Sequence, residues 1–316
     1  MEFLDLFAGI GGFRLGMESA GHECIGFCEI DKFARASYKA IHDTKGEIEL
    51  HDITTVSDES IRRIGRVDII CGGFPCQAFS IAGNRRGFED PRGSLFFEIA
   101  RFASILRPKY LFLENVKGLL NHDGGATFET ILGALDELGY NVEWQVLNSK
   151  DFGVPQNRER VLIVGHLRGE CTRRVFPLSK SGQQVASIKE QYSNTIKTRY
   201  GNSQGGEHDI APTLTSNSYQ ENNPVKVVDF YNKITKDEVG TLTSSGGGST
   251  VRAGSFGITD GYRIRKLTPR ECWRLQGFPD WAFDKAQEVN SNSQLYKQAG
   301  NSVTVNVIAA IAKEMK

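Results

Sequence analysis

The first half of the chain alternates short apolar runs with longer amphipathic segments. The apolar runs predict β-strands at residues 2–6, 24–29, 67–71, 110–114, 142–148 and 161–165. The amphipathic segments carry apolar residues at helical spacing and predict helices at residues 13–20, 31–41, 58–64, 94–106 and 127–138. This alternation predicts an α/β fold, in which helices cover both faces of a doubly wound, mostly parallel sheet.

The pattern changes between residues 167 and 262, where helical periodicity is lost. Gly, Ser, Thr and Asn make up 39 of these 96 residues, yet Ile, Val, Leu, Tyr and Phe recur among them. Such a composition is typical of a disordered linker, but an unstructured insert of this length is uncommon in a compact domain. We therefore predict a small, loop-rich second lobe. Globular patterning returns near the C-terminus, where residues 302–311 predict an apolar helix.

Composition and charge narrow the class of protein. Basic and acidic residues number 38 each, which argues against a generic nucleic-acid coat but leaves room for a basic face. No apolar run approaches about 20 residues and no basic-then-apolar leader opens the chain, so we expect neither a membrane span nor a secretion signal. Six cysteines without CxxC pairs indicate reduced thiols in the cytosol, and no metal site is expected.

One cysteine stands apart from the others. Cys76 follows the tight turn Gly72-Gly73-Phe74-Pro75, directly after the predicted strand 67–71. Ligands bind at this edge of open α/β sheets, and the cysteine thiolate is a strong nucleophile. A lone cysteine is more often a small buried hydrophobe. We expect that simpler role for the other five cysteines, which are Cys24, Cys28, Cys71, Cys171 and Cys272.

Two further strand ends carry charged side chains. Glu114 ends the apolar strand 110–114, and Arg158 and Arg160 precede the strand 161–165. Three strand ends thus supply a thiol, a carboxylate and two guanidinium groups to one edge of the sheet. Taken alone, each arginine would more simply form a surface ion pair with Glu159.

The opening strand runs into a Gly-rich turn, Gly9-Ile10-Gly11-Gly12. Glycines let the backbone turn sharply and pass close to a ligand. The second strand ends in Glu29, and an acidic residue at that position can bind ribose hydroxyls. These two features alone would fit a nicotinamide dinucleotide as well, although the spacing is not G-x-G-x-x-G.

Taken together, six stretches resemble the motifs of the C5-cytosine-specific DNA methyltransferases, in that family's order. They are residues 3–16, 72–80, 114–116, 156–161, 265–271 and 298–303. The resemblance implies a Rossmann-like fold that binds S-adenosylmethionine (SAM) as methyl donor, releases S-adenosylhomocysteine and needs no metal. It implies a flipped cytosine of duplex DNA as the substrate.

The resemblance also assigns residues to roles. It implies that Cys76, held by Pro75, attacks C6 of the base, that Glu114 bonds N3 and the exocyclic amine, and that Arg160, supported by Arg158, stabilises charge at O2. The implied cofactor contacts are Asp5, Phe7, Ala8, Gly9, Ile10, Gly11, Gly12, Glu29, Ile30, Asp52, Ile53, Leu95, Asn301, Ser302 and Val303. The implied DNA contacts are Gln77, Ser80, Arg85, Arg92, Thr241 and Leu242.

The same resemblance divides the chain into two domains. Residues 1–166 would bind SAM and catalyse, completed by the C-terminal helix at about 298–316, and residues 167–297 would form the target-recognition domain with its organising segment. A Thr-Leu pair of the recognition domain lies near the target base in this family. We favour Thr241-Leu242 over Thr213-Leu214, because three glycines follow it and the 265–271 motif is near.

Other functions remain open at this point. An RNA (tRNA) cytosine-5 methyltransferase of the same family shares the catalytic motifs, and a non-catalytic DNA-binding relative could retain the fold. A nicotinamide-dependent dehydrogenase would leave residues 72–80 and 156–161 unexplained. We expect a monomer in the cytoplasm, at the nucleoid of a prokaryotic host, whose partner is double-stranded DNA. It would serve restriction-modification or phage self-protection, with any cognate restriction endonuclease acting separately.

Overall fold

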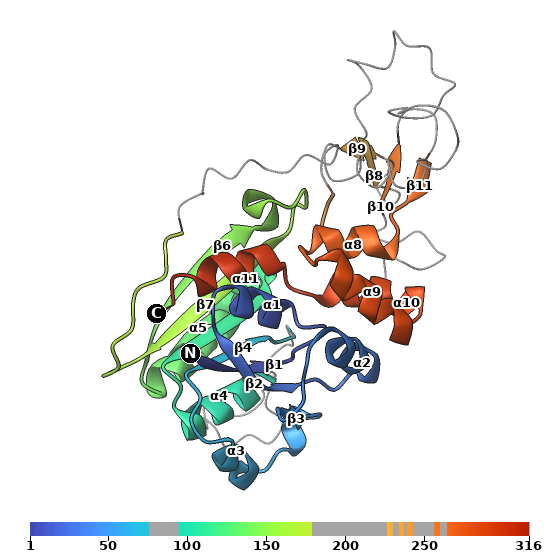
Figure 1. The fold of residues 1–316 in the computed structure, drawn as a ribbon. Helices are drawn as coiled ribbons and strands as arrows, with labels where there is room; N and C mark the ends of the chain where they lie inside the picture. Colours follow the sequence, from blue (N-terminus) through green and yellow to red (C-terminus); the bar gives the residue numbers. More distant parts are fainter. Residues whose placement is uncertain are drawn as a thin grey trace, which may run out of the picture.

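A seven-stranded sheet forms the centre of the molecule (Figure 1). The computed structural model describes residues 1–75, 95–178, 226–229, 234–236, 239–242, 256–259 and 264–315. The strand order is β3-β2-β1-β4-β5-β7-β6, and β1 to β5 are parallel, whereas β7 is antiparallel to both β5 and β6. The strands are β1 (Glu2–Leu6), β2 (Glu23–Cys28), β3 (Ile48–Leu50), β4 (Ile69–Gly73), β5 (Tyr110–Val116), β6 (Tyr140–Asn148) and β7 (Glu159–Leu167).

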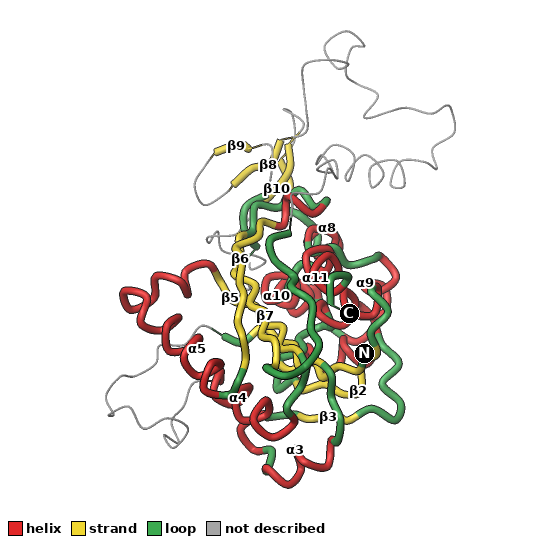
Figure 2. Tube along the Cα trace, turned by 90° about the vertical axis from the view of Figure 1, so that its left-hand side faces the viewer, coloured by secondary structure: helices red, strands yellow, loops and turns green. Residues whose placement is uncertain are grey.

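Helices cover both faces of this sheet, as Figure 2 shows for α4 and α5 on one face and α11 on the other. Both faces are therefore buried, which explains why the central strands are continuous apolar runs rather than alternating ones. The helices of this layered lobe are α1 (Gly12–Ser19), α2 (Lys32–Ile41), α3 (Asp58–Ile64), α4 (Leu95–Leu106), α5 (Ala126–Glu137) and α11 (Val305–Ala312). Short 3-10 helices are η1 (Ile53–Thr55), η3 (Lys117–Gly125) and η4 (Ser149–Phe152).

The chain after β7 crosses the same face as α11. The side chain of Glu143 on β6 accepts hydrogen bonds from the backbone N–H groups of Val175 (2.6 Å) and Phe176 (3.2 Å). Both of those side chains are buried with residues of α1, α11 and the central strands. Residues 173–178, which we call the strap, therefore belong to the packing of the large sheet.

Three further helices pack beside α2. They are α8 (Pro269–Leu275), α9 (Asp280–Val289) and α10 (Asn292–Asn301). Trp273 is fully buried at their centre and donates from its indole nitrogen to the carbonyl of Leu295 at 2.9 Å. The same apolar cluster includes Ile10 of the Gly-rich turn and Leu242. These helices thus connect the Gly-rich end of the sheet with residues 239–242.

A four-stranded antiparallel sheet lies beyond α8 (Figure 1). Its order is β11-β10-β8-β9, and its strands are β8 (Lys226–Asp229), β9 (Ile234–Lys236), β10 (Phe256–Thr259) and β11 (Ile264–Lys266). The predicted second lobe therefore contains regular strands in its described part. The strap and the helices α8 to α10 lie within the predicted recognition domain but contact the large lobe. The domain boundaries at 166 and 297 therefore stay predictions.

The doubly wound, mostly parallel sheet that the sequence predicts is confirmed. The sequence pattern missed β3, which has only three residues, and did not resolve α8, α9 and α10 as separate helices. It placed the last helix over 302–311, whereas α11 begins at Val305, because Ser302 is a C-cap of α10.

Candidate active site

The carboxyl ends of β4 and β5 meet at one edge of the sheet. Gly73 pairs with Glu114, and a Cβ atom built on Gly73 would lie 3.2 Å from Oε2 of that carboxylate. The glycine therefore leaves the space that Glu114 occupies. The chain continues from Gly73 to Pro75, which is exposed, and then leaves the described residues. The predicted nucleophile Cys76 lies outside them, as do Gln77, Ser80, Arg85 and Arg92.

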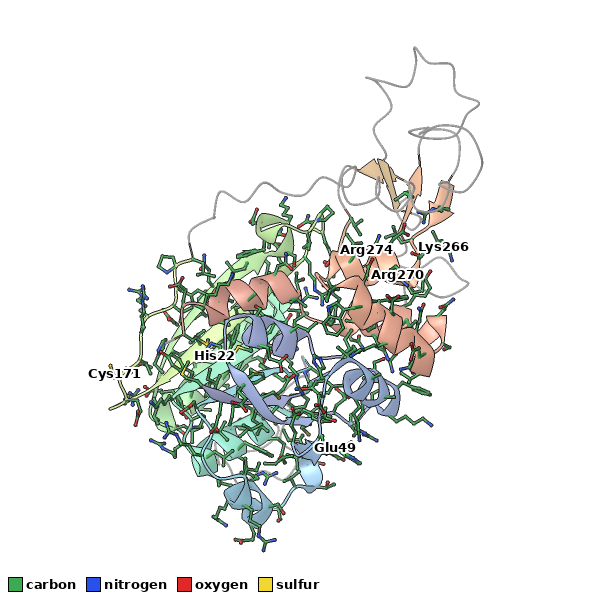
Figure 3. All side chains as sticks on the ribbon, in the orientation of Figure 1. His22, Glu49, Cys171, Lys266, Arg270 and Arg274 are labelled. Carbon is green, nitrogen blue, oxygen red and sulfur yellow. The ribbon has the colours of Figure 1, made fainter. Side chains whose placement is uncertain are left out.

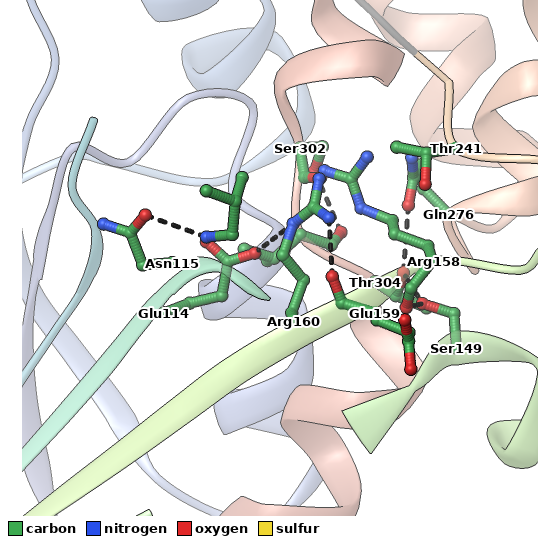
Figure 4. A network of polar contacts seen from close by, with 12 residues as sticks. Glu114, Asn115, Ser149, Arg158, Glu159, Arg160, Thr241, Gln276, Ser302 and Thr304 are labelled. Atoms are coloured by element: carbon green, nitrogen blue, oxygen red, sulfur yellow. Dashed lines mark hydrogen bonds and ion pairs between the residues drawn. The ribbon is translucent and has the colours of Figure 1, made fainter. Parts of the chain in front are cut away.

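Glu114 forms an ion pair with Arg160 of β7, and Figure 4 shows the two side chains reaching toward each other. Nε of the arginine lies 2.9 Å from Oε1 of the carboxylate, and the two side chains are only 16% and 11% exposed. Glu159 instead pairs with Lys117 at 3.0 Å. The alternative of a surface ion pair between Arg160 and Glu159 is therefore wrong, although Arg160 does donate to the backbone carbonyl of Glu159.

Asn115 holds the segment that precedes Pro75. Its Nδ2 donates to the carbonyl of Phe74 at 2.9 Å, and its Oδ1 accepts the backbone N–H of Val116 at 2.8 Å. The side chain is buried, so its bond to Phe74 fixes the turn that leaves β4, while the bond from Val116 fixes the orientation of the amide. The sequence pattern alone predicts no site role for this residue. Its signal was an amide at the end of an otherwise apolar strand.

Arg158 is buried and bonds only backbone carbonyls among the described residues. It donates to Ser302 at 2.7 Å, to Leu242 at 3.3 Å and to Gly300 at 3.4 Å. Burial, together with the like charge of Arg160, lowers the pKa of Arg158 to about 9. A surface ion pair with Glu159 is therefore wrong for this arginine as well. Its geometry suits support of the site and not contact with a substrate.

The Gly-rich turn after β1 has left-handed backbone at Phe7, Gly9 and Gly11, with φ of 56°, 57° and 85°. A left-handed conformation is strained for a non-glycine residue such as Phe7, and such strain concentrates at ligand sites. Space is open around Gly9, whereas a side chain at Gly11 would collide with the ring of His42. A Cβ on Gly12 would lie 2.8 Å from Val303, so the C-terminal motif packs directly on this turn.

Glu29 lies beside the turn, at the end of β2. Its two carboxylate oxygens accept the N–H groups of Gly9 and Asp31, both at 2.7 Å, and burial raises its pKa. The neighbouring Ile30 is 67% exposed, which is unusual for a large apolar side chain. An acidic group, an exposed apolar surface and an open glycine suit the ribose, adenine and methionine parts of SAM.

The other predicted cofactor residues lie around this edge in different environments. Asp5 is fully buried in β1, where Oδ2 lies 3.5 Å from the Tyr38 hydroxyl, and burial raises its pKa to about 8. Asp52 caps η1 through a bond from the N–H of Thr54 at 3.0 Å. Buried side chains are Ala8, Ile10, Ile53 and Ser302; Leu95 is half-buried and Asn301 is exposed.

The Thr241-Leu242 pair lies against the loop before β7. The Thr241 hydroxyl donates to the carbonyl of Asn157 at 3.2 Å, and Leu242 is buried. The competing pair Thr213-Leu214 lies outside the described residues. Near this junction, Figure 3 shows Lys266, Arg270 and Arg274 close together at the side of α8. Arg270 and Arg274 pair with Asp284 and Asp280 of α9, both at 2.5 Å.

In the part of the chain that the structure describes, no three His, Cys, Asp or Glu side chains gather as metal ligands would. Within that same part, every helix is too short or too polar to span a membrane.

Comparison with known proteins links this geometry to one family. The profile described as C-5 cytosine-specific DNA methylase matches residues 1–316. The type II methyltransferase M.HhaI of Haemophilus parahaemolyticus is 37% identical, over 99% of this chain and 93% of that protein. M.HpaII of Haemophilus parainfluenzae is 40% identical, over 99% of this chain and 88% of that protein. The crystal structure of S. pombe Dnmt2 methyltransferase has a TM-score of 0.66 at 20% identity, over 98% of this chain and 96% of that one, and so shares the fold.

Proposed function

Because the chain belongs to the family of C-5 cytosine-specific DNA methylases, we propose that it methylates C5 of a flipped cytosine in duplex DNA, with SAM as the donor and through a covalent adduct at Cys76. One observation carries the chemistry. Glu114 and Arg160 form a largely buried ion pair at the end of β4, beside the turn that leads to Cys76. A carboxyl and a guanidinium so placed can bond neighbouring polar atoms on one edge of a base.

The chain's own groups account for most of the reaction. The Cys76 thiolate adds to C6 of cytosine, which makes C5 a carbon nucleophile. Glu114 bonds N3 and the exocyclic amine and supplies a proton to N3 as electrons move onto the ring, while Arg160 stabilises charge at O2. After C5 is methylated, its proton leaves to solvent, the thiolate departs from C6 and N3 returns its proton to Glu114, which restores the aromatic ring and the starting state of the enzyme.

The cofactor residues fit SAM, which when bound supplies an electrophilic methyl group. Glu29 would accept the ribose hydroxyls, and the exposed side chain of Ile30 would cover the adenine. The open space at Gly9 would admit the methionine end. Asp5 is fully buried at the end of β1 and faces Tyr38, so it would support the turn that follows and not contact the methionine end directly.

A covalent trap tests this proposal. A duplex with 5-fluorocytosine at the target position should form a stable adduct with the protein when SAM is present, because fluorine on C5 does not leave as a proton. Cys76→Ser should bind the same duplex without trapping it. Bisulfite sequencing of DNA from an expressing host would identify the site. Trapping that persists in Cys76→Ser would refute the role of this cysteine.

The relatives support DNA over RNA as the substrate. M.HhaI and M.HpaII are type II methyltransferases, and an orphan methyltransferase of Bacillus phage SPR is 29% identical over the whole chain. We propose a monomer that acts in the cytoplasm on host or phage DNA, separately from any restriction endonuclease. Parallel assays with the duplex and with tRNA decide between the substrates, since an RNA enzyme would label only the tRNA.

A further inference from the structure

Residues 155–158 and 239–242 lie side by side at the junction of the two lobes. The N–H of Val239 donates to the carbonyl of Pro155 at 3.1 Å, and the N–H of Asn157 donates back to the carbonyl of Val239 at 2.7 Å. The Thr241 hydroxyl adds a third bond, to the carbonyl of Asn157. A displacement of residues 239–242 would therefore also displace residues 155–158, which lead into β7.

The guanidinium of Arg158 extends this junction into the C-terminal motif. It donates to Leu242 on one side and to Gly300 and Ser302 on the other. These partners lie 84, 142 and 144 residues away in the chain. The carbonyl of Arg158 itself accepts the N–H of Ser149 at 3.0 Å. Arg158 thus joins the start of β7 to three other segments, and Figure 4 shows it with Ser149 and Ser302.

The catalytic pair begins two residues further on. Arg158 lies directly before β7, which begins at Glu159, and its backbone is held by the N–H of Ser149 and by the side chain of Asn148. The position of Arg158 therefore constrains where the Arg160 side chain starts toward Glu114. Burial and the like charge of Arg160 both lower the pKa of Arg158.

Several buried polar groups at this junction lack a hydrogen-bond partner among the described residues. Among the described residues, Nε of Arg158 and both side-chain polar atoms of Gln156 are buried without a hydrogen-bond partner. No carboxylate of that part of the chain pairs with Arg158. Buried polar groups and charges without partners are costly.

We propose that Arg158 is a positioning residue that couples the engagement of the target at Thr241-Leu242 to the placement of Arg160 and Glu114. This inference rests on the proposed function, because it takes residues 241–242 as the segment that meets the target base. When that segment moves onto its target, the bond to the Leu242 carbonyl would carry the movement to the catalytic pair. Discrimination between sites would then depend on Arg158.

The test compares two duplexes, one with the methylated site found by sequencing and one with a single base-pair change in it. Arg158→Lys keeps the charge, but a single ammonium does not reproduce the planar fork that bonds carbonyls on two sides. We expect kcat on the cognate duplex to fall about 10- to 100-fold, since small misplacements of catalytic groups cost that much. The KM for SAM should stay within about threefold of wild type.

The ratio of rates on the two duplexes is the deciding measurement. A single changed base pair commonly lowers affinity by roughly tenfold or more, and Arg158→Lys should lose most of this discrimination. A purely structural role would lower both rates equally and leave the ratio unchanged. The control is Arg14→Lys, because Arg14 is also buried and bonds a backbone carbonyl, that of Asp43, together with Glu18 and Glu47, away from this junction. In this control variant, the ratio of rates on the two duplexes should stay at the wild-type value.

Hydrogen exchange on the wild-type protein provides a second measurement that does not depend on a folded variant. Cognate duplex should change exchange in residues 155–160 and 239–242 together, and the altered duplex should change neither as strongly. A response confined to 239–242, or an unchanged ratio in Arg158→Lys, would overturn the inference. A wild-type protein that methylates no DNA would instead refute the proposed function, so the two failures are distinguishable.

Discussion

Arg158 and Arg160 stand two residues apart, yet their guanidinium groups meet different partners. Arg160 bonds the carboxylate of Glu114, whereas Arg158 bonds backbone carbonyls as far as 144 residues away. The sequence pattern brings both to one strand end, because the apolar run that follows predicts β7. It does not reveal their partners, because those depend on tertiary contacts that no local spacing encodes.

Substituting Glu114 tests its proposed role directly. Glu114→Gln keeps the shape but removes the charge and the acidic proton, so methyl transfer should slow by about 10²–10³-fold. Unfolding free energy should also fall, by about 1–3 kcal/mol, because Arg160 loses its carboxylate partner. Single-turnover rates at saturating SAM and DNA separate the two effects. The matched control is Glu159→Gln, whose carboxylate forms only an exposed pair with Lys117; activity within a few-fold of wild type in Glu114→Gln would contradict the assignment.

The raised pKa of Asp5 predicts that the stability of the folded protein depends on pH. Its pKa in the folded protein is about 8, above its ordinary value of 3.8, so between these values the folded state binds more protons than the unfolded state. The stability that this provides is complete below about pH 4 and is lost as the pH rises toward 8.

Thermal unfolding of wild type and Asp5→Asn from pH 5 to pH 8 checks this dependence. The wild type should lose stability relative to the variant as the pH rises. Asp52→Asn is the control, because hydrogen bonds from Thr54 hold the pKa of Asp52 below its ordinary value, so it does not titrate in this range. A constant difference between wild type and Asp5→Asn would show that Asp5 does not titrate there.

At the scale of elements, the sequence predicts best where local pattern and tertiary context agree. The strand 110–114 and the helix 127–138 are long and strongly patterned, and β5 and α5 lie within one or two residues of those bounds. β3 forms only because Ile48–Leu50 pairs with β2 at the sheet edge, a contact between separate segments. α8 depends on a capping box between Thr268 and Glu271, a signal that the hydrophobic pattern does not include.

The helices α1 and α11 approach each other closely at Gly16. Gly16 of α1 lies against α11, and a Cβ there would be 2.7 Å from Ile308. Gly→Ala in a helix usually stabilises by up to about 1 kcal/mol, but Gly16→Ala should destabilise by about 1–3 kcal/mol because of overpacking. Gly133→Ala in α5 is the control, since nothing lies within 4 Å of its Cβ position. Urea unfolding of both variants should give opposite signs.

At the scale of the whole molecule, the large lobe is assembled from distant parts of the chain. α11 packs on α1, the strap lies on β6, and the helices α8 to α10 share a core with Ile10 and Leu242. A composition break at residue 167 predicts two lobes, but it does not locate the contacts between them. The strap and residues 239–242 fall inside the predicted recognition segment, yet both bond to the large lobe.

These contacts determine how a specificity exchange should be designed. If residues 167–262 set the target sequence, replacing residues 179–255 with those of a relative that methylates another site should move the methylated position, provided that Val239, Thr241 and Leu242 are kept. Replacing all of 167–262 would also remove the strap, so that chimera should unfold at a lower temperature. Bisulfite sequencing identifies the site of each protein, and the product should remain 5-methylcytosine because Glu114 and Arg160 are unchanged. A well-folded 179–255 chimera that still methylates the original sequence would show that recognition resides elsewhere, in residues that the exchange leaves in place.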